Sequence, residues 1–511
     1  MIDLVGFGLL MMANNPIIWA DVPDISIVRV GHAYYMSSTT MHMSPGLPIM
    51  KSNDLVHWKL VSYAYRTLGD NEALTLSNGK SAYGKGSWAS SLRYHNGMFY
   101  ATTFSSTTGK TYIFSTKNPE KTPWKEVSFS PSIHDHSLIF EDDGRVYLAH
   151  GAGNIRLLEL NSDLSGPKPG GIDKVIVPNA SRVAGEAIGL PAEGSQMFKV
   201  KGKYYLCNIT WPRNGMRTEI VHRADKLEGP YEGRVMLHDQ GVAQGGMIDT
   251  PDGKWYAYLF QDHGAVGRIP YLVPMTWKDG WPVVGVDGKV PMTLDIPGRK
   301  STLSGLVASD EFNRKPGDNS LPLAWQWNHN PDDRYWSLSE HPGSLRLITG
   351  RVDQDVLHAR NTLTQRTFGP ECYGTTSIDV SSMKDGDIAG LIALQNHYGF
   401  VGVKMEGTQK SVVVVTAENN SAVETATVPL TQNRIWLRID CDFKDRADTA
   451  AFSYSLDGKN WNVIGKPHHL RYDLVHFMGC RFGLFNFATK TPGGHVDFDF
   501  FHIGSVLPHT L

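Results

Sequence analysis

The sequence predicts an all-β protein in which a five-bladed β-propeller is followed by a C-terminal β-sandwich. Two observations support the propeller: a hairpin-forming unit recurs five times before Pro297, and no helical periodicity longer than a turn or two occurs in the 511 residues. Four short strands in a unit that repeats every roughly 45–65 residues are typical of propeller blades. The sandwich is predicted because the unit disappears after Pro297-Gly298, while alternating strand patterns continue.

Each unit begins with a strand, a tight turn and a second strand. Alternating apolar and β-branched residues flank turns such as Asn96-Gly97 and Lys201-Gly202, which is the pattern of a β-hairpin. A third strand follows, and then a turn and an outer strand that carries an aromatic residue such as Trp58. The five copies begin near Asp24, Ala89, Asp135, Gly194 and Gly245. We therefore expect the propeller to occupy residues 1–305.

Residues 306–511 are predicted to form an antiparallel sandwich. Alternating strands are expected at 344–348, 390–394, 436–440 and 496–503, and 454–461 reads as a hairpin around Asp457-Gly458. Chains of this length usually contain more than one domain.

Composition excludes some classes of partner. The 49 basic and 51 acidic side chains give a net charge of -2, so neither a nucleic-acid track nor a membrane-binding surface is indicated. The apolar run 4–13 is too short to span a bilayer. Widely spaced cysteines at 207, 372, 441 and 480 are expected to be buried free thiols. The compartment stays open between bacterial cytoplasm and periplasm or exterior, and a homo-oligomer is not excluded.

Three of the five units carry a carboxylate at or next to the start of the inner strand, namely Asp24, Asp135 and Glu193. Inner strands of a propeller surround its axis, so we expect these side chains to converge at one end. Converging carboxylates are energetically costly unless they do chemistry. An acid, a base and a third charge that raises the pKa of the acid would suit hydrolysis of a glycosidic bond. For any one of them alone, a turn or cap role is the simpler explanation.

Several segments resemble glycoside hydrolase family 43. Asp21-Val22-Pro23-Asp24-Ile25-Ser26 and Lys51-Ser52-Asn53-Asp54-Leu55 resemble its opening, and Gly86-Ser87-Trp88-Ala89, His134-Asp135-His136-Ser137 and Ala192-Glu193-Gly194 resemble its later signatures. The segments 309–312 and 325–331 resemble the accessory sandwich of its β-xylosidase and α-L-arabinofuranosidase branch. The resemblance extends over essentially the whole chain.

The resemblance implies an inverting, exo-acting hydrolase with a concanavalin-like accessory domain. Asp24 matches the general base, Asp135 the aspartate that modulates pKa, and Glu193 the general acid. Trp88, Met41, Arg268 and Gln244 match positions that contact substrate. The implied substrates are xylo-oligosaccharides or arabinose-decorated plant cell-wall glycans, from which terminal xylose or arabinofuranose is released. Phe485 or Phe487 of the sandwich is expected to wall the pocket, although core packing would explain both equally well.

No cofactor is required for this chemistry, but two places for a structural Ca²⁺ are suggested. The first is the axis, where Gln244 stands in place of a histidine found in many family members and His263 lies nearby. The second is the sandwich, where Glu311 and Asp499 are candidates by analogy. Two alternatives to an exo-glycosidase stay open: an endo-arabinanase with an open groove, and a carbohydrate-binding propeller without turnover.

Overall fold

The structure is a computed structural model that describes residues 12–505 except 123, 299–302, 304 and 419–420. The predicted all-β class is confirmed. Helical structure in the described part consists of three short 3₁₀ segments, η1 (Ala180–Ala184), η2 (Gly264–Val266) and η3 (Lys444–Arg446). Residues 4–11 of the apolar run lie outside the described residues. No helix among the described residues is long and apolar enough to cross a membrane.

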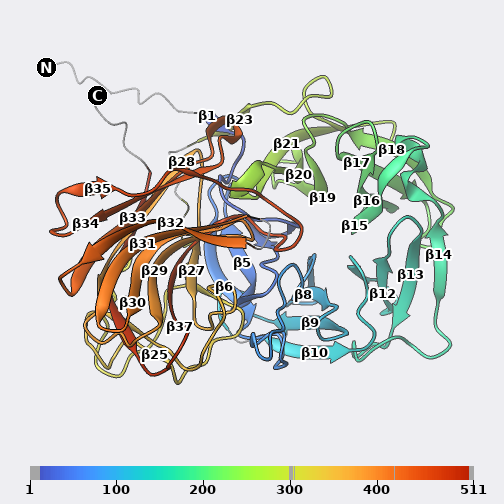
Figure 1. Ribbon diagram of the computed structural model, residues 1–511. Helices are drawn as coiled ribbons and strands as arrows, with labels where there is room; N and C mark the ends of the chain where they lie inside the picture. The colour runs from blue at the N-terminus through green and yellow to red at the C-terminus, as the bar shows by residue number, and fades with distance from the viewer. Residues whose placement is uncertain (1–11, 123, 299–302, 304, 419–420, 506–511) are drawn as a thin grey trace, which may run out of the picture.

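Five four-stranded antiparallel sheets form the propeller, as predicted (Figure 1). Four sheets run from inner to outer strand in sequence order, and the one of blade 1 skips β4. Blade 1 contains β2 (Ser26–Val30), β3 (Ala33–Ser37), β5 (Gly46–Ser52) and β6 (Lys59–Tyr65), and blade 2 contains β7 (Ser91–His95), β8 (Met98–Ser105), β9 (Lys110–Thr116) and β10 (Lys125–Phe129). Blade 3 contains β11 (Ser137–Phe140), β12 (Val146–His150), β13 (Ile155–Leu160) and β14 (Asp173–Val177). Blade 4 contains β15 (Ile188–Val200), β16 (Lys203–Pro212), β17 (Thr218–Ala224) and β18 (Glu232–Leu237), and blade 5 contains β19 (Ala243–Asp249), β20 (Trp255–Asp262), β21 (Arg268–Lys278) and β22 (Trp281–Val284).

Turn chemistry fixes the hairpins between inner strands and their neighbours. Asn96-Gly97 has φ of 47° and 79°, and Lys201-Gly202 has φ of 48° and 79°. Positive φ at both central residues is the type I′ turn, whose twist matches that of the paired strands. The chain ends of the propeller meet where β1 (Met12–Asn14) pairs with β23 (Thr293–Pro297).

Two sheets form the predicted sandwich. The first has the order β32-β31-β30-β29-β37-β27-β24-β4, and the second β25-β26-β38-β28-β33-β34-β35 with β36 paired to β34. Their strands are β4 (Met43–Ser44), β24 (Gln326–Asn328), β25 (Trp336–Ser337), β26 (Leu345–Ile348), β27 (Leu363–Arg366), β28 (Glu371–Asp379), β29 (Asp387–Leu394), β30 (Gly399–Glu406), β31 (Gln409–Glu418), β32 (Ser421–Leu430), β33 (Arg434–Asp442), β34 (Thr449–Ser455), β35 (Trp461–Val463), β36 (His468–His469), β37 (Arg481–Ala488) and β38 (His495–Gly504).

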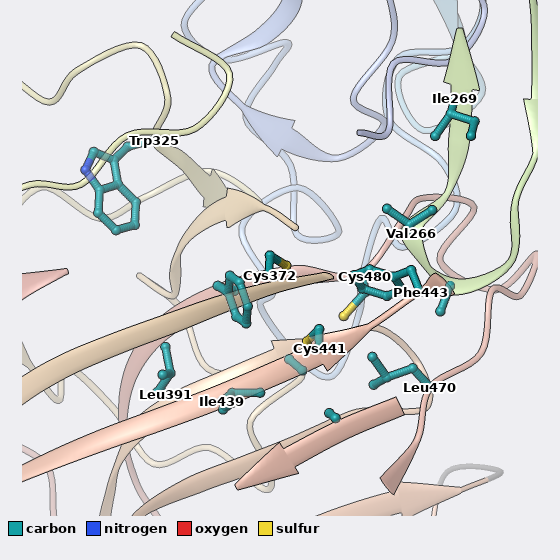
Figure 2. Close-up of a cluster of buried hydrophobic side chains, with 14 of the residues drawn as sticks. Val266, Ile269, Trp325, Cys372, Leu391, Ile439, Cys441, Phe443, Leu470 and Cys480 are labelled. Carbon is teal, nitrogen blue, oxygen red and sulfur yellow. The ribbon is translucent and has the colours of Figure 1, made fainter. Parts of the chain in front are cut away.

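The two domains share backbone hydrogen bonds and a core. β4 leaves blade 1 and pairs with β24 at the edge of a sandwich sheet, so strands from both sides of the predicted boundary near residue 305 share hydrogen bonds. In Figure 2, Val266, from the segment between β20 and β21, lies close to Cys480 and Phe443 of the sandwich. Ile269 and Cys441 belong to the same buried cluster. All four cysteines are free and buried, as predicted.

Candidate active site

A cavity of about 580 Å³ lies where the inner strands begin. Every blade contributes to its lining, and the sandwich supplies one further wall. The lining residues are Asp24, Trp88, Ala89, His134, Asp135, Gly189, Leu190, Glu193, Trp211, Arg213, Arg217, Gln244, Arg268, Leu474 and Phe477. The structure therefore brings together the three carboxylates singled out by the sequence repeat, together with Trp88, Gln244 and Arg268.

Asp24 lies two residues before β2 and is only 5% exposed. Its two carboxylate oxygens accept hydrogen bonds from Nη1 of Arg268 at 3.0 and 3.2 Å. Burial raises the pKa of Asp24, Arg268 opposes this, and the nearby charges of Asp21 and Glu193 raise it further. A buried carboxylate that is held by one guanidinium from below has its remaining lone pairs available to the cavity.

Asp135 occupies the equivalent place before β11, and the two backbones match. Their φ angles are 44° at Asp135 and 52° at Asp24, both in the left-handed region that costs free energy for a residue with a Cβ. Oδ2 of Asp135 accepts a hydrogen bond from the Gly194 amide at 2.9 Å. Burial raises the pKa of Asp135 to about 7, with the charges of Glu193 and Asp24 adding to it and His134 opposing it. Asp135 is thus fixed against the backbone of the residue that follows Glu193.

Glu193 lies within β15 rather than before it, which differs from the other two carboxylates. The pairing of β15 with β16 shifts register on both sides of Glu193, and such bulges re-aim a side chain. Asn208 of β16 donates to the carbonyl of Glu193 at 3.2 Å. The Glu193 side chain is 24% exposed, compared with 7% for Asp135, so it faces the open part of the cavity.

His134, which belongs to the signature His134-Asp135-His136-Ser137, is a site residue that the repeat did not predict. Its Nε2 lies 3.1 Å from Oε2 of Glu193 and 3.7 Å from Oδ2 of Asp135. Burial lowers the pKa of His134, but the hydrogen bond with Glu193 and the charge of Asp135 outweigh it and raise the pKa to about 9. One feature of the sequence could have indicated a role for His134. It directly precedes Asp135, whereas neither Asp24 nor Glu193 follows a histidine.

The same three groups could hold a metal ion, since their ligand atoms all lie within 4.8 Å of one another. A cation there would use Nε2 of His134 and an oxygen of Glu193, the atoms that already share the hydrogen bond. The cation and the hydrogen bond are therefore alternatives.

The expected calcium sites do not fit the structure well. His263 is not among the residues that line the cavity, and its Nδ1 bonds to Gln261 at 3.2 Å. In the sandwich, Glu311 contacts His502 and Asp499 pairs with Arg434, so each acid is bonded to a different basic side chain and the two do not share a site.

Aromatic side chains form one side of the cavity. The ring of Trp88 lies 5.1 Å from that of Phe477, and the Arg268 guanidinium lies 4.8 Å from the Phe477 ring. Met41, in contrast, is 1% exposed and does not line the cavity, so the expectation that it contacts substrate is corrected. Its backbone pairs with Ser87, the residue before Trp88.

The sandwich wall consists of Leu474 and Phe477, not of Phe485 and Phe487. The latter two are 0% and 4% exposed and pack in the sandwich core, because their strand β37 runs through the middle of its sheet. Asp21 holds the Phe477 loop against the propeller, since its two oxygens accept from the amides of Arg268 at 2.8 Å and Gly479 at 3.0 Å.

The outer rim carries groups that sequence reasoning missed. Trp211 is 41% exposed, and the guanidinium of Arg217 lies 5.3 Å from its ring while pairing with Asp262 at 2.6 Å. Gln244 lies deeper, where its backbone N–H donates to Oε2 of buried Glu219 at 2.8 Å and its φ is 58°.

Replacing Asp135 with asparagine should stabilise the fold increasingly as pH rises from 5 to 8. The folded-state pKa of about 7 lies above the ordinary value of an aspartate. The contribution of protonated Asp135 to the free energy of unfolding is therefore fully present below about pH 4 and is lost as pH rises through 7. The variant cannot ionise and avoids that loss. The melting temperature of the variant, relative to that of the wild type, should be about 2–4 °C higher at pH 8 than at pH 5.

Asp143→Asn is the matched control, because this exposed aspartate has its pKa lowered by hydrogen bonds to Arg145. The melting temperature of this control, relative to that of the wild type, should not rise between pH 5 and pH 8. A flat difference between pH 5 and 8 for Asp135→Asn would contradict the raised pKa.

The geometry suits acid–base chemistry on a molecule bound among Asp24, Glu193 and an aromatic wall. Residues 13–282 match the family described as Glycosyl hydrolases family 43, and residues 309–504 match the Beta xylosidase C-terminal Concanavalin A-like domain. The chain is 58% identical to a solved structure of a bifunctional GH43-CE from Bacteroides eggerthii, with a TM-score of 0.95 over 98% of this chain. This chain spans 64% of that one.

Two curated relatives are more distant. A beta-xylosidase of Formosa agariphila is 28% identical over 95% of this chain and 89% of its own length. A non-reducing end alpha-L-arabinofuranosidase of Bacteroides ovatus is 27% identical over 80% of this chain and 78% of its own.

Proposed function

The chain belongs to glycoside hydrolase family 43, and from this premise we propose that it removes terminal xylose or arabinofuranose from plant cell-wall oligosaccharides with inversion at the anomeric carbon. One observation carries the proposal: three carboxylates from three blades meet in a cavity that the sandwich closes on one side. A walled cavity accepts the end of a glycan chain, whereas an endo-acting enzyme needs an open groove.

The three carboxylates take different roles because their surroundings differ. Glu193, at the open side, protonates the glycosidic oxygen of the leaving group. Asp24, held by Arg268, accepts a proton from the water that attacks the opposite face of the sugar. Asp135 accepts a hydrogen bond from the Gly194 amide, so it orients the acid through the backbone next to it and is the third carboxyl group of the site. These proton transfers need no cofactor.

Sugar recognition follows from the rest of the cavity. Trp88 and Phe477 present apolar surfaces to the apolar face of a pentose ring, and Arg268 and Gln244 offer polar groups to its hydroxyls. Trp211 at the rim provides a platform for the next sugar of the chain. Xylose and arabinofuranose can place their hydroxyls similarly in one pocket, so the proposal includes activity on both.

Replacing Phe477 with alanine should raise KM for short oligosaccharides roughly tenfold, because the terminal sugar loses an aromatic contact. kcat should change much less, since no proton-transfer group is moved. Steady-state kinetics on xylobiose and an arabinofuranosyl oligosaccharide would measure this. Phe485→Leu is the control: it lies in the sandwich core and should lower stability but leave KM unchanged. A larger KM change in the control would place the wall at Phe485 instead.

The proposed function is tested by proton NMR during hydrolysis of a β-xyloside. The first product to accumulate should be the α anomer of xylose. A β-anomeric first product would contradict inversion, internal cleavage of long arabinan would indicate the endo-acting alternative, and binding of oligosaccharide without turnover would indicate a carbohydrate-binding module. Parallel kinetics on nitrophenyl β-xyloside and α-arabinofuranoside would rank the two sugars.

A further inference from the structure

The side chain of Arg93, from the inner strand of blade 2, reaches into the middle of the propeller below the carboxylates. Its five N–H groups lie within hydrogen-bond distance of six neutral acceptors, so at least one N–H is shared between two of them. The acceptors are Leu138 O at 3.0 Å, Leu92 O at 2.7 Å, Ser137 Oγ at 2.6 Å, Gln196 Oε1 at 3.3 Å, Met197 O at 3.3 Å and Ser26 Oγ at 3.4 Å.

These acceptors place the guanidinium at the propeller axis. They belong to β2, β7, β11 and β15, which are four of the five inner strands. The inner strands surround the axis, so a single group that bonds to four of them must lie near it. The fifth blade approaches through Gly246, where a Cβ would lie 2.4 Å from the Phe198 ring, and that ring lies 5.8 Å from the guanidinium carbon.

The strands that Arg93 ties together are those that carry the three carboxylates. Ser26 and Ser137 follow Asp24 and Asp135 by two residues each, and Gln196 follows Glu193 by three. The neighbouring backbones are bonded as well: the Leu92 amide donates to Ser26 at 3.0 Å and the Met197 amide to Ser137 at 2.9 Å. One guanidinium thus connects the three strands at positions two or three residues beyond the carboxylates that line the cavity.

Stability alone does not account for a charge in this place. Arg93 has no ion-pair partner among the described residues, and burial lowers the pKa of its guanidinium. Holding a partly buried ion without a counter-charge carries a desolvation cost, and a neutral polar side chain could satisfy some of the same acceptors without that cost. What a shorter neutral side chain could not do is hold four strands in fixed positions by directed hydrogen bonds.

We propose that Arg93 is a positioning residue that sets the spacing of Asp24, Asp135 and Glu193 through the inner strands. The inference rests on the proposed function, because it assigns these carboxylates to catalysis. Proton transfer depends steeply on the placement of the acid and the base, so a small shift of one strand lowers kcat while the sugar contacts at Trp88 and Phe477 remain.

Two variants test the proposal. Arg93→Lys keeps the charge but cannot bridge four strands, and it should lower kcat roughly tenfold with KM within about twofold. Arg93→Ala should lower kcat roughly 100-fold. Alanine leaves a cavity lined by the same oxygens. Methylguanidinium in the assay should therefore raise kcat of Arg93→Ala at least about fivefold, whereas an equal concentration of NaCl should not.

Arg29→Ala is the matched control. Arg29 also bonds two inner strands, since it pairs with Asp249 of β19, but it does so at the opposite end of β2 from Asp24. It should lower the melting temperature and leave kcat unchanged.

The outcomes separate this inference from the proposed function. A wild-type enzyme that releases no pentose overturns the proposed function itself. With an active wild type, the positioning role is overturned if Arg93→Ala retains kcat within about twofold of wild type. It is equally overturned by the following pair of results. Arg93→Ala and Arg29→Ala lose kcat in the same proportion to their losses in melting temperature, and methylguanidinium does not raise kcat of Arg93→Ala.

Discussion

Glu193→Gln should lower kcat on xylobiose roughly 1000-fold while leaving the binding of oligosaccharide largely intact. The glutamine amide keeps the shape of the side chain and its place in β15 but cannot give a proton to the leaving oxygen. The loss should shrink strongly for a dinitrophenyl xyloside, because that leaving group departs without protonation. Kinetics on the two substrates, with calorimetric titration of xylobiose into the variant, measure all three effects.

Glu186→Gln is the control for this experiment. It makes the same chemical change at an exposed glutamate that lies before β15, with a side chain that is 87% exposed, and it should leave both substrates unaffected. Unchanged turnover of xylobiose by Glu193→Gln would remove Glu193 from the role of acid. An equal loss on both substrates would instead indicate a role in water activation.

The propeller could be predicted from sequence because its information is local and repeated. Type I′ turns at Asn96-Gly97 and Lys201-Gly202 specify hairpins by themselves, and the five-fold recurrence counts the blades. The pairing of β4 with β24 could not be predicted in this way, because it joins residues almost 300 positions apart without a repeated pattern. Two residues, Met43 and Ser44, are too few to show a strand period.

In the candidate site, too, the repeat predicts some features, whereas others depend on contacts between distant segments. Asp24 and Asp135 were recognised because they hold the same place in two copies of the repeat, and their backbones share a left-handed φ. Glu193 was expected at or next to the start of its inner strand, whereas the structure places it inside a bulged strand. The bulges depend on cross-strand register, which a single sequence does not reveal.

Residues that act from outside the repeat were missed for physical reasons. Phe477 follows no strand pattern, and its position depends on the contact of Asp21 with the Gly479 amide across the domain interface. Phe485 and Phe487 looked suitable by residue type, but a central strand buries both. Arg93 reads as an ordinary polar residue in an alternating strand, and only the closure of the ring shows that its side chain points to the axis.

Asp24→Asn should lower kcat by about 1000-fold or more on both xylobiose and the dinitrophenyl xyloside, since both reactions need an activated water. Equal losses on the two substrates would distinguish the base from the acid, whose loss depends on the leaving group. The substitution also leaves Arg268 without its counter-charge at 3.0 Å, which is destabilising for a buried pair. The melting temperature of this variant should therefore fall.

Asp24→Glu separates catalysis from that loss of stability. Glutamate keeps a negative charge for Arg268, so the melting temperature should stay closer to wild type than that of Asp24→Asn. Its carboxylate is displaced by one methylene, and a misplacement of about 1 Å is enough to lower kcat roughly 100-fold. A stable Asp24→Glu enzyme with wild-type kcat would show that the position of this carboxylate does not limit water attack, and the base would then have to be sought at Asp135.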